Sequence, residues 1–458
     1  MGATSDLVRY VAKADYSDFP QEVVETTKAF ILDTLGVAVA GSSAEGCKDV
    51  VDQMLYWGGK PESTIWVFGG KVPSFHAPLA NAMMAHARDF DDTHEGIGAH
   101  CHVSVLPAAL AAAEQRGGVS GRELITAVAL GVDLFVRLGQ SINLFYSWHS
   151  TGILGSYGAA FAAGKILGLS EKQLQNAIGI AHTQTPGCNR QARKDGSLAK
   201  RMNPGFAAMG GVLSANLALR GLTGAKAALE GEHGFFNLYK DHGEEFDADQ
   251  ATRRLFDGLG ERYEVTNLSF KPYGACRSTH AAIDGALELS RLGQIRPDDI
   301  ESVTVYASAV TMEKVGTPFE IRTNPQVDAQ FSIPYTVAVA LLRGKVLLSD
   351  FEIDNIKSQE LNQLAKKVQC ILKPELKGRV PTILEIKTKD GRTLSNTVNV
   401  IKGHPSKPLT REERLEKFLS CWDSAANLLP RDNADRLIQA VDRLEEVEEV
   451  SQLVEMLT

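Results

Sequence analysis

The chain has 458 residues, which is enough for a large core or for two domains. Its composition, 44% hydrophobic and 23% charged, is ordinary for a globular protein, and its formal net charge of -8 disfavours nucleic acid as the main partner. The first residues contain no basic stretch followed by an apolar run, and no apolar run reaches the roughly 18 residues of a membrane span. Six scattered cysteines without a C-x-x-C pair predict reduced thiols and a cytoplasmic location.

Up to about residue 255 the sequence predicts mostly helices. Apolar or small residues recur at helical spacing in segments 21–41, 121–139, 152–168 and 206–221. Gly41 is positioned to end the first of these helices, and Ser170 with Gln173 forms a capping box before another. A further helix is predicted from His76 to near Asp92.

After about residue 265 the pattern changes to strands mixed with short helices. Val303 and Val305 alternate with polar residues, as in a half-buried strand. The segment 382–400 predicts a hairpin, with its turn at Asp390-Gly391. Helices are expected over 333–344, over 359–370 and again from about residue 409 to the C-terminus.

These patterns predict a mainly α protein with a second, α+β domain. We expect a large helical domain over residues 1–265 that is completed by residues 405–458, and a smaller domain over residues 266–404.

The segment "DFDDTHEGIGAHCH", residues 89–102, is unusually dense in titratable groups. On the predicted helix, His86, Asp89 and Thr93 would share one face, and His100 and His102 would point the same way if their stretch were extended. Pro107 would then open the next helix.

The segment can be interpreted as a solvated polar loop, a metal site or an acid/base site. Possible metal ligands are Asp91, Asp92, His94, His100, Cys101 and His102, although no H-E-x-x-H or zinc-finger spacing supports a metal. The acid/base interpretation follows from histidine, whose pKa lies closest to neutrality.

Basic residues elsewhere are suited to binding an anion. A loop just before a helix predicted to start near Pro204 contains Arg190, Arg193, Lys194, Lys200 and Arg201. Lys271 and Arg277 lie where the composition changes, hence at a domain junction. His149 precedes a Gly-rich helix and is either a helix-start or core residue or a site residue. Phosphate-binding loops and dinucleotide fingerprints are absent, so nucleotide cofactors lack support.

Several blocks in order, among them "ILDTLGVAVAG", "ARDFDDTH", "HSTGILGSYGAAFAAGKILGLS", "FKPYGACRSTHAAID" and "FSIPYTVAVALLRG", resemble the MmgE/PrpD family over nearly the whole chain. That family includes 2-methylcitrate dehydratase, cis-aconitate decarboxylase and iminodisuccinate epimerase. The resemblance implies a helical domain plus an α+β lid, a site between them without metal or cofactor, and a homodimer.

The family's functional positions match Asp89, Thr93, His102, His149, Lys200, Lys271 and Tyr335. Candidate substrate contacts are Arg190, Arg201, Asn203, Arg277 and His100. One departure is the stretch Met202-Asn203-Pro204-Gly205, where relatives often have a histidine before the glycine. The loop between Thr93 and His102 is more similar to the decarboxylase and epimerase branch.

The resemblance therefore predicts a metal-free lyase that decarboxylates or dehydrates a small di- or tricarboxylic acid. In this scheme His102 and His149 move protons, lysines and arginines bind carboxylates, and His102→Ala reduces kcat more than stability. Two alternatives remain: an epimerase that removes a proton next to a carboxylate, and a relative that binds carboxylates without turnover.

Overall fold

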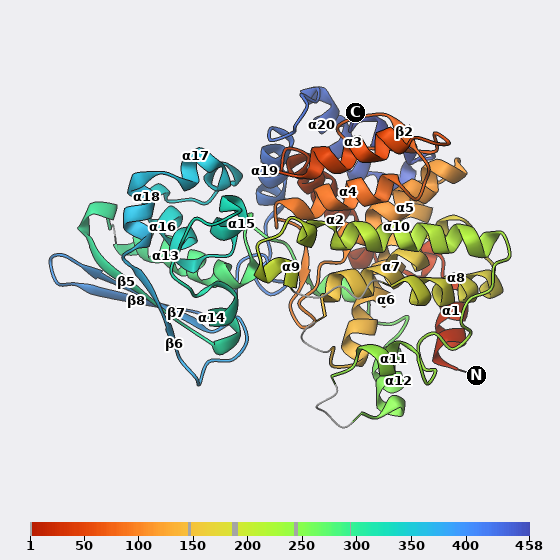
Figure 1. Ribbon diagram of the computed structural model, residues 1–458, viewed down its shortest axis with the longest axis horizontal. Coiled ribbons are helices and arrows are strands. Elements are labelled where there is room, and N and C mark those ends of the chain that lie inside the picture. Colours follow the sequence, from red (N-terminus) through yellow and green to blue (C-terminus); the bar gives the residue numbers. More distant parts are fainter. Residues whose placement is uncertain (1, 145–147, 186–190, 242–245, 294) are drawn as a thin grey trace. The chain divides into compact units, whose positions relative to one another are not determined.

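The computed structural model describes residues 2–144, 148–185, 191–241, 246–293 and 295–458 (Figure 1). The chain divides into two compact units. The first comprises Met1–Ala87, Asp91–Leu268 and Arg411–Thr458, and the second comprises Arg88–Phe90 and Ser269–Thr410. The first unit is mostly helical, and the second combines helices with a 4-stranded sheet. This combination confirms the predicted fold class.

The first unit is a helical assembly with a few very short strands. Its helices are α1 (Ala3–Lys13), α2 (Gln21–Gly41), α3 (Cys47–Trp57), α4 (Ala77–Ala87), α5 (His102–Arg116), α6 (Gly121–Ser141), α7 (Ser150–Ile166), α8 (Glu171–Gln184), α9 (Gln191–Lys194), α10 (Ala199–Leu219), α11 (Phe235–Tyr239), α12 (Ala248–Phe256), α19 (Arg411–Trp422), α20 (Arg431–Asp442) and α21 (Ser451–Glu455). The strands are β1 (Ser63–Thr64), β2 (Lys71–Val72), β3 (Thr93–His94) and, at the boundary, β4 (Leu268–Ser269).

Helix α7 forms the centre of this unit. It contacts α5, α6, α8 and α10, and all of its residues except Lys165 are buried. Small residues make this close packing possible: a Cβ added to Gly211 of α10 would lie 2.5 Å from the Cβ of Ala159 in α7. The predicted buried Gly/Ala helix is therefore confirmed, as is the capping box of Ser170 and Gln173 that opens α8.

The C-terminal helices belong to the same unit. Helices α19 and α20 pack on α2, and the buried Lys417 ammonium lies 2.7 Å from a carboxylate oxygen of Asp33. Burial raises the pKa of Asp33, and the Lys417 charge opposes that shift. The pair thus joins the two ends of the chain in one core.

The helix α4 is shorter than predicted. It ends at Ala87, and Asp89 adopts a φ of 49°, in the left-handed region that a right-handed helix cannot contain. Thr93 lies in the short strand β3. His86, Asp89 and Thr93 therefore do not share a helical face, so this prediction was wrong.

Two other helices begin earlier than predicted. Helix α5 starts at His102 and α10 at Ala199, so Pro107 and Pro204 lie inside helices, where each removes one backbone donor. Cys101 has the backbone angles of a right-handed helix, so the stretch around it is not extended. The expectation that His100 and His102 point the same way fails for that reason.

Helix α6 is, within the described part of the chain, the one helix long and apolar enough to cross a membrane. Inside the unit, 94% of its apolar window is buried. Because α6 lies inside the unit, most of its surface is apolar, and its buried Asp133 and Arg137 pair with each other. We expected no apolar segment long enough to span a membrane, and by length and composition α6 is such a segment.

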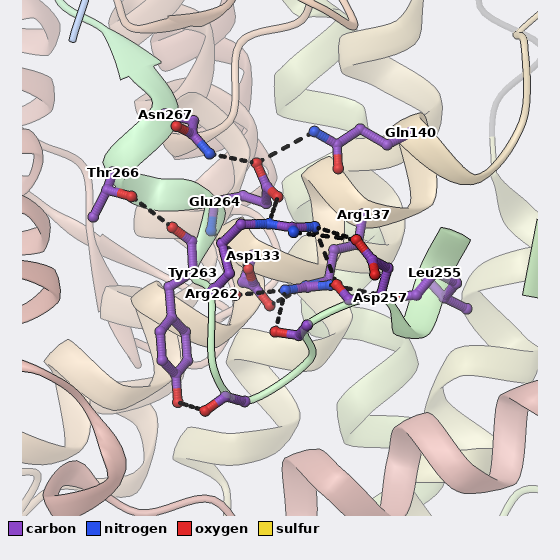
Figure 2. A network of polar contacts seen from close by, with 12 residues as sticks. Asp133, Arg137, Gln140, Leu255, Asp257, Arg262, Tyr263, Glu264, Thr266 and Asn267 are labelled. Atoms are coloured by element: carbon purple, nitrogen blue, oxygen red, sulfur yellow. Dashed lines mark hydrogen bonds and ion pairs between the residues drawn. The ribbon is translucent and has the colours of Figure 1, made fainter. Parts of the chain in front are cut away.

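A buried arginine in α6 organises the segment that follows α12 (Figure 2). The Arg137 guanidinium lies 2.8 Å from the Asp133 carboxylate and donates to the backbone carbonyls of Asp257, Gly258 and Arg262. The other carboxylate oxygen of Asp133 accepts the backbone N–H of Glu264 at 2.8 Å. One ion pair therefore satisfies several backbone groups that have little access to water.

We expect Arg137→Met to destabilise the protein by about 3–5 kcal/mol, because the buried Asp133 carboxyl and the backbone carbonyls of Asp257, Gly258 and Arg262 would all lose their partner. The measurement is urea unfolding followed by circular dichroism. Arg253→Met is the matched control, since Arg253 is exposed and pairs with Asp247 at 3.4 Å; its effect should stay within about 0.5 kcal/mol. Equal effects of the two substitutions would contradict the assigned role of Arg137.

The second unit is built around a sheet with strand order β6-β5-β7-β8. Its strands are β5 (Ile300–Ala307), β6 (Val368–Leu372), β7 (Thr382–Thr388) and β8 (Thr393–Val398). Its helices are α13 (Arg277–Gly293), α14 (Ala309–Val315), α15 (Pro325–Gln330), α16 (Ile333–Arg343), α17 (Ile353–Ile356) and α18 (Gln359–Ala365). The strand β5 pairs parallel to β6 and antiparallel to β7, and Val303 and Val305 are buried as predicted.

The hairpin prediction is confirmed by β7 and β8, which pair antiparallel from Thr382 opposite Val398. The helix predicted over 359–370 is only half right: α18 ends at Ala365 and β6 follows. Helices α13 and α16 contact strands of this sheet and enclose the core of the second unit.

Candidate functional site

Titratable side chains of the first unit gather around the connection between α4 and α5. His86 lies in the last turn of α4, Asp91 and His100 lie in the connection, and His149 is the N-cap of α7. Lys200 is in the first turn of α10 and acts electrostatically on His86. The chain thus brings residues from three helices and one loop into a single polar cluster.

One carboxylate oxygen joins two of the histidines. Oδ2 of Asp91 lies 2.9 Å from Nδ1 of His86 and 3.1 Å from Nδ1 of His100. The two imidazole rings are 4.9 Å apart between centroids, and the ring of His149 lies 6.4 Å from that of His86. The side chains of His86 and Asp91 are fully buried, whereas that of His100 is 15% exposed. Of these three side chains, that of His100 is therefore the one that solutes can reach.

Hydrogen bonds identify which ring nitrogen is basic. Nδ1 of His100 lies 2.7 Å from the backbone carbonyl oxygen of Asp92, which can only accept, so Nδ1 holds a proton and donates it. The backbone N–H of His100 donates to Oγ1 of Thr151 at 3.1 Å. In the neutral ring Nε2 therefore has the lone pair that can take up a proton. Asp91 stabilises the imidazolium that results.

The protonation of the His86 ring can be assigned in the same way, and its surroundings keep the ring neutral. Burial lowers the pKa of His86 to about 4, and the Lys200 charge acts in the same direction while Asp91 opposes them. His86 is thus neutral near pH 7 and donates from Nδ1 to Asp91. Its Nε2 is buried and has no hydrogen-bond partner among the residues that the structure describes.

His102 lies apart from this pair. Its side chain is fully buried, and its ring stacks on Phe30 with 5.0 Å between centroids. Asp92 accepts the backbone N–H groups of Cys101 and His102 at 3.0 and 3.2 Å and so caps the start of α5. Burial, followed by the Asp92 charge, raises the pKa of the Cys101 thiol well above its usual value. A proton-transfer role for His102 stays a prediction.

The connecting loop is tied to the network of Figure 2. Nδ1 of His94 accepts the N–H of Ile97 at 3.3 Å, and its Nε2 lies 3.8 Å from a carboxylate oxygen of Glu264. Burial would raise the pKa of Glu264, but hydrogen bonds from His94, Asn267 and Arg262 outweigh it and lower that pKa to about 2. Glu264 is therefore charged at neutral pH and anchors the loop.

The other residues of the first unit that the sequence predicted for the site are buried or donate hydrogen bonds to the backbone. Thr93 is buried in β3. The Arg201 side chain is 3% exposed and donates to the backbone carbonyl of Glu45 at 2.8 Å, and Asn203 is buried inside α10. Arg190 lies outside the described residues. Roles for these residues in substrate binding stay predictions.

In the second unit the structure pairs two predicted site residues. Nζ of Lys271 lies 2.8 Å from a carboxylate oxygen of Asp89 and 2.8 Å from the backbone carbonyl oxygen of the same residue. Lys271 has no exposed surface, and Asp89 is 4% exposed. Aspartate is among the few residues that tolerate the left-handed φ found here.

Two other predicted residues of this unit have structural partners. The Arg277 guanidinium donates to the backbone carbonyl of Lys402 at 2.8 Å and lies 3.3 Å from Nδ1 of His280. The Tyr335 hydroxyl donates to the backbone carbonyl of Asp350, and its ring packs 4.8 Å from that of Phe319. Burial raises the pKa of Tyr335 far above its usual value.

Sequence reasoning placed His86 only on a predicted helical face and Asp91 only among possible metal ligands, and it predicted neither as a catalytic or substrate-binding residue. His86 and Asp91 are five residues apart and lie on either side of the end of α4, so no helical or strand periodicity places them together. The signal that could have identified them is the presence of four charged or titratable residues, His86, Arg88, Asp89 and Asp91, within six positions.

The arrangement suits proton transfer next to an anion. A solvent-accessible imidazole is oriented by a buried carboxylate, and an ammonium group lies within electrostatic range. His86, Asp91 and His100 also present donor atoms that all lie within 4.8 Å of one another, a spacing that could hold a metal ion.

Family models match both halves of the chain. The MmgE/PrpD N-terminal domain matches residues 5–247, and the MmgE/PrpD C-terminal domain matches residues 273–446.

Curated relatives match over most of their lengths. A cis-aconitate decarboxylase of Aspergillus terreus is 27% identical over 99% of this chain and 96% of its own length. The cis-aconitate decarboxylase of Mus musculus is 28% identical over 95% and 89%, and the 2-methylcitrate dehydratase of Escherichia coli is 22% identical over 81% and 77%. Because both family domains match in order, the chain belongs to the MmgE/PrpD family as a lyase-type member.

Proposed function

We propose that the chain decarboxylates or dehydrates a small di- or tricarboxylic acid similar to cis-aconitate or methylcitrate. The names of its relatives support this class of reaction and substrate. The observation that carries the proposal is the His86–Asp91–His100 cluster, in which His100 is accessible and its Nε2 is the basic nitrogen.

Both reactions pass through a species with extra negative charge. In decarboxylation the bond between a carbon and a carboxylate breaks, its electron pair stays on the carbon framework, and a proton is added there. In dehydration a proton leaves a carbon beside a carboxylate, and hydroxide leaves as water after receiving a proton. We assign the proton transfer to Nε2 of His100, with Asp91 stabilising the imidazolium by its charge at 3.1 Å.

Cations would bind the carboxylates of the substrate. Lys200 is partly exposed and already acts on His86 through space, so its ammonium group is suited to a substrate carboxylate in the same region. His149 begins α7 close to His86 and is a second proton-transfer candidate. We further propose that neither metal nor organic cofactor takes part, which a chelator test on the purified enzyme would check.

We expect one compound among aconitates, citrate, methylcitrate and amino-dicarboxylates to be consumed when the purified protein is incubated with each of them in D2O. Mass spectrometry distinguishes the outcomes: loss of CO2 indicates a decarboxylase, and loss or gain of water indicates a dehydratase. Deuterium uptake beside a carboxylate without any other change would identify the epimerase alternative. Thermal stabilisation by a ligand without turnover of any compound would contradict the lyase proposal.

A further inference from the structure

We propose that His86, Asp91 and His100 form a binding site for a divalent cation of the zinc class. The donor atoms of these three side chains all lie within 4.8 Å of one another. Two of them are fully buried and the third is 15% exposed, so a cation could enter from the side of His100 and be largely shielded from water. This inference rests on geometry and is independent of the proposed reaction.

The spacing of the donor atoms fits a small cation. Two ligands of a tetrahedral zinc ion lie about 3.3 Å apart, given Zn–N and Zn–O bonds of about 2.0–2.2 Å. Asp91 Oδ2 lies 2.9 Å from Nδ1 of His86 and 3.1 Å from Nδ1 of His100. These two distances are a few tenths of an ångström shorter than the spacing of zinc ligands, and all three donor atoms lie within 4.8 Å of one another, so the side chains have to adjust around the ion.

The chemistry of the donors selects the class of metal. Two imidazole nitrogens and one carboxylate oxygen suit Zn²⁺, Co²⁺, Ni²⁺ or Fe²⁺, whereas Mg²⁺ and Ca²⁺ prefer oxygen donors alone. The carbonyl oxygen of Asp92, 2.7 Å from Nδ1 of His100, lies at the edge of the same site. The Asp92 carboxylate caps α5 immediately beside it and adds a second negative charge, which opposes the positive charge that Lys200 exerts on His86.

Binding would change the histidine tautomers. Nδ1 of each ring now holds a proton toward an oxygen, so an ion bound at Nδ1 requires that proton to leave and the ring to keep its hydrogen on Nε2. His100 would then have no lone pair on Nε2. If His100 transfers protons as proposed above, the ion inhibits the enzyme by removing its basic nitrogen.

The hydrogen bonds around the two histidine rings limit the affinity of this site for a metal ion. Metal-bound histidines are normally held by a partner on the second ring nitrogen, and loss of such a partner weakens binding by about 10–100-fold. Within the described residues, Nε2 of His86 has no such partner. We therefore expect a site that responds to added metal and releases it to a chelator.

The test uses the untagged full-length protein after treatment with EDTA and desalting. Titration with Co²⁺ should produce the intense visible absorption of a tetrahedral site and saturate at one ion per chain, and Zn²⁺ should displace Co²⁺. His100→Asn should weaken Co²⁺ binding at least tenfold, and Asp91→Asn should do the same. His404→Asn, a change at a partly exposed histidine of the second unit, should leave binding unchanged.

Absence of saturable Co²⁺ binding by the wild-type protein would overturn the proposal, as would equal binding by wild type and His100→Asn. His100 is partly exposed, so its variant is expected to fold even if Asp91→Asn does not. Activity is measured separately. An inactive wild-type protein that still binds Co²⁺ through His100 would contradict the proposed reaction and support the metal site.

Discussion

Replacement of His100 by asparagine should lower kcat by about 10²–10⁴-fold, the usual contribution of a positioned acid/base group. The side chain is 15% exposed, and the backbone N–H that bonds to Thr151 is unchanged by the substitution, so the fold should persist. The measurements are kcat and KM on the substrate found by the D2O screen, together with the melting temperature. A folded variant with wild-type kcat would contradict the assignment of His100.

His102→Ala is the matched comparison, because the sequence alone favoured His102. Its ring is fully buried against Phe30, so its removal leaves a cavity and should cost about 2–5 kcal/mol of stability. We expect the melting temperature to fall with kcat changing less than in His100→Asn. The reverse pattern, a large loss of kcat at unchanged stability, would restore His102 as the proton-transfer residue.

Loss of the Lys271 charge should be the most destabilising change in the second unit. Lys271→Met leaves the buried Asp89 carboxylate without its ammonium partner at 2.8 Å, and breaking such a pair costs about 3–5 kcal/mol. Urea unfolding followed by circular dichroism should show the loss. Tryptophan fluorescence reports the first unit, which contains all four tryptophans, so the two probes together reveal whether the units unfold separately.

Two variants keep this prediction testable. Asp89→Asn in the Lys271→Met background removes the orphaned charge and retains a residue that accepts the left-handed φ of 49°, so it should recover part of the stability. Lys387→Met removes an exposed lysine that pairs with Glu301 and should change stability by no more than about 0.5 kcal/mol. If the double variant is no more stable than Lys271→Met, the buried charge is not the cause.

The spacing of apolar residues along the sequence predicted most of the fold. It did so because most helices here have the same kind of surroundings along their whole length. The Gly/Ala run of α7 and the capping box before α8 are local signals, and the structure contains both. Strand β6 was missed because Lys366 and Lys367 continue the helical pattern of α18 while the pairing of β6 with β5 is a long-range contact. No local pattern contains that information.

The sequence indicated which types of residue form the candidate site better than it indicated how those residues are arranged. The dense segment from Asp89 to His102 contains Asp91 and His100 of the cluster, whereas His86 precedes the segment, and His102 is the first residue of α5. The left-handed Asp89 ends the helical course of the chain, and it is this break that allows Asp91 to reach back to His86. A single backbone angle of this kind is set by tertiary contacts, among them the bonds from Lys271.

The shared oxygen of Asp91 has a consequence for kinetics. Because two imidazoles contact the same atom, replacing either ring changes the surroundings of the other. The effects of His86→Asn and His100→Asn on kcat will therefore not add. A double-mutant cycle on kcat measures the coupling between the two rings.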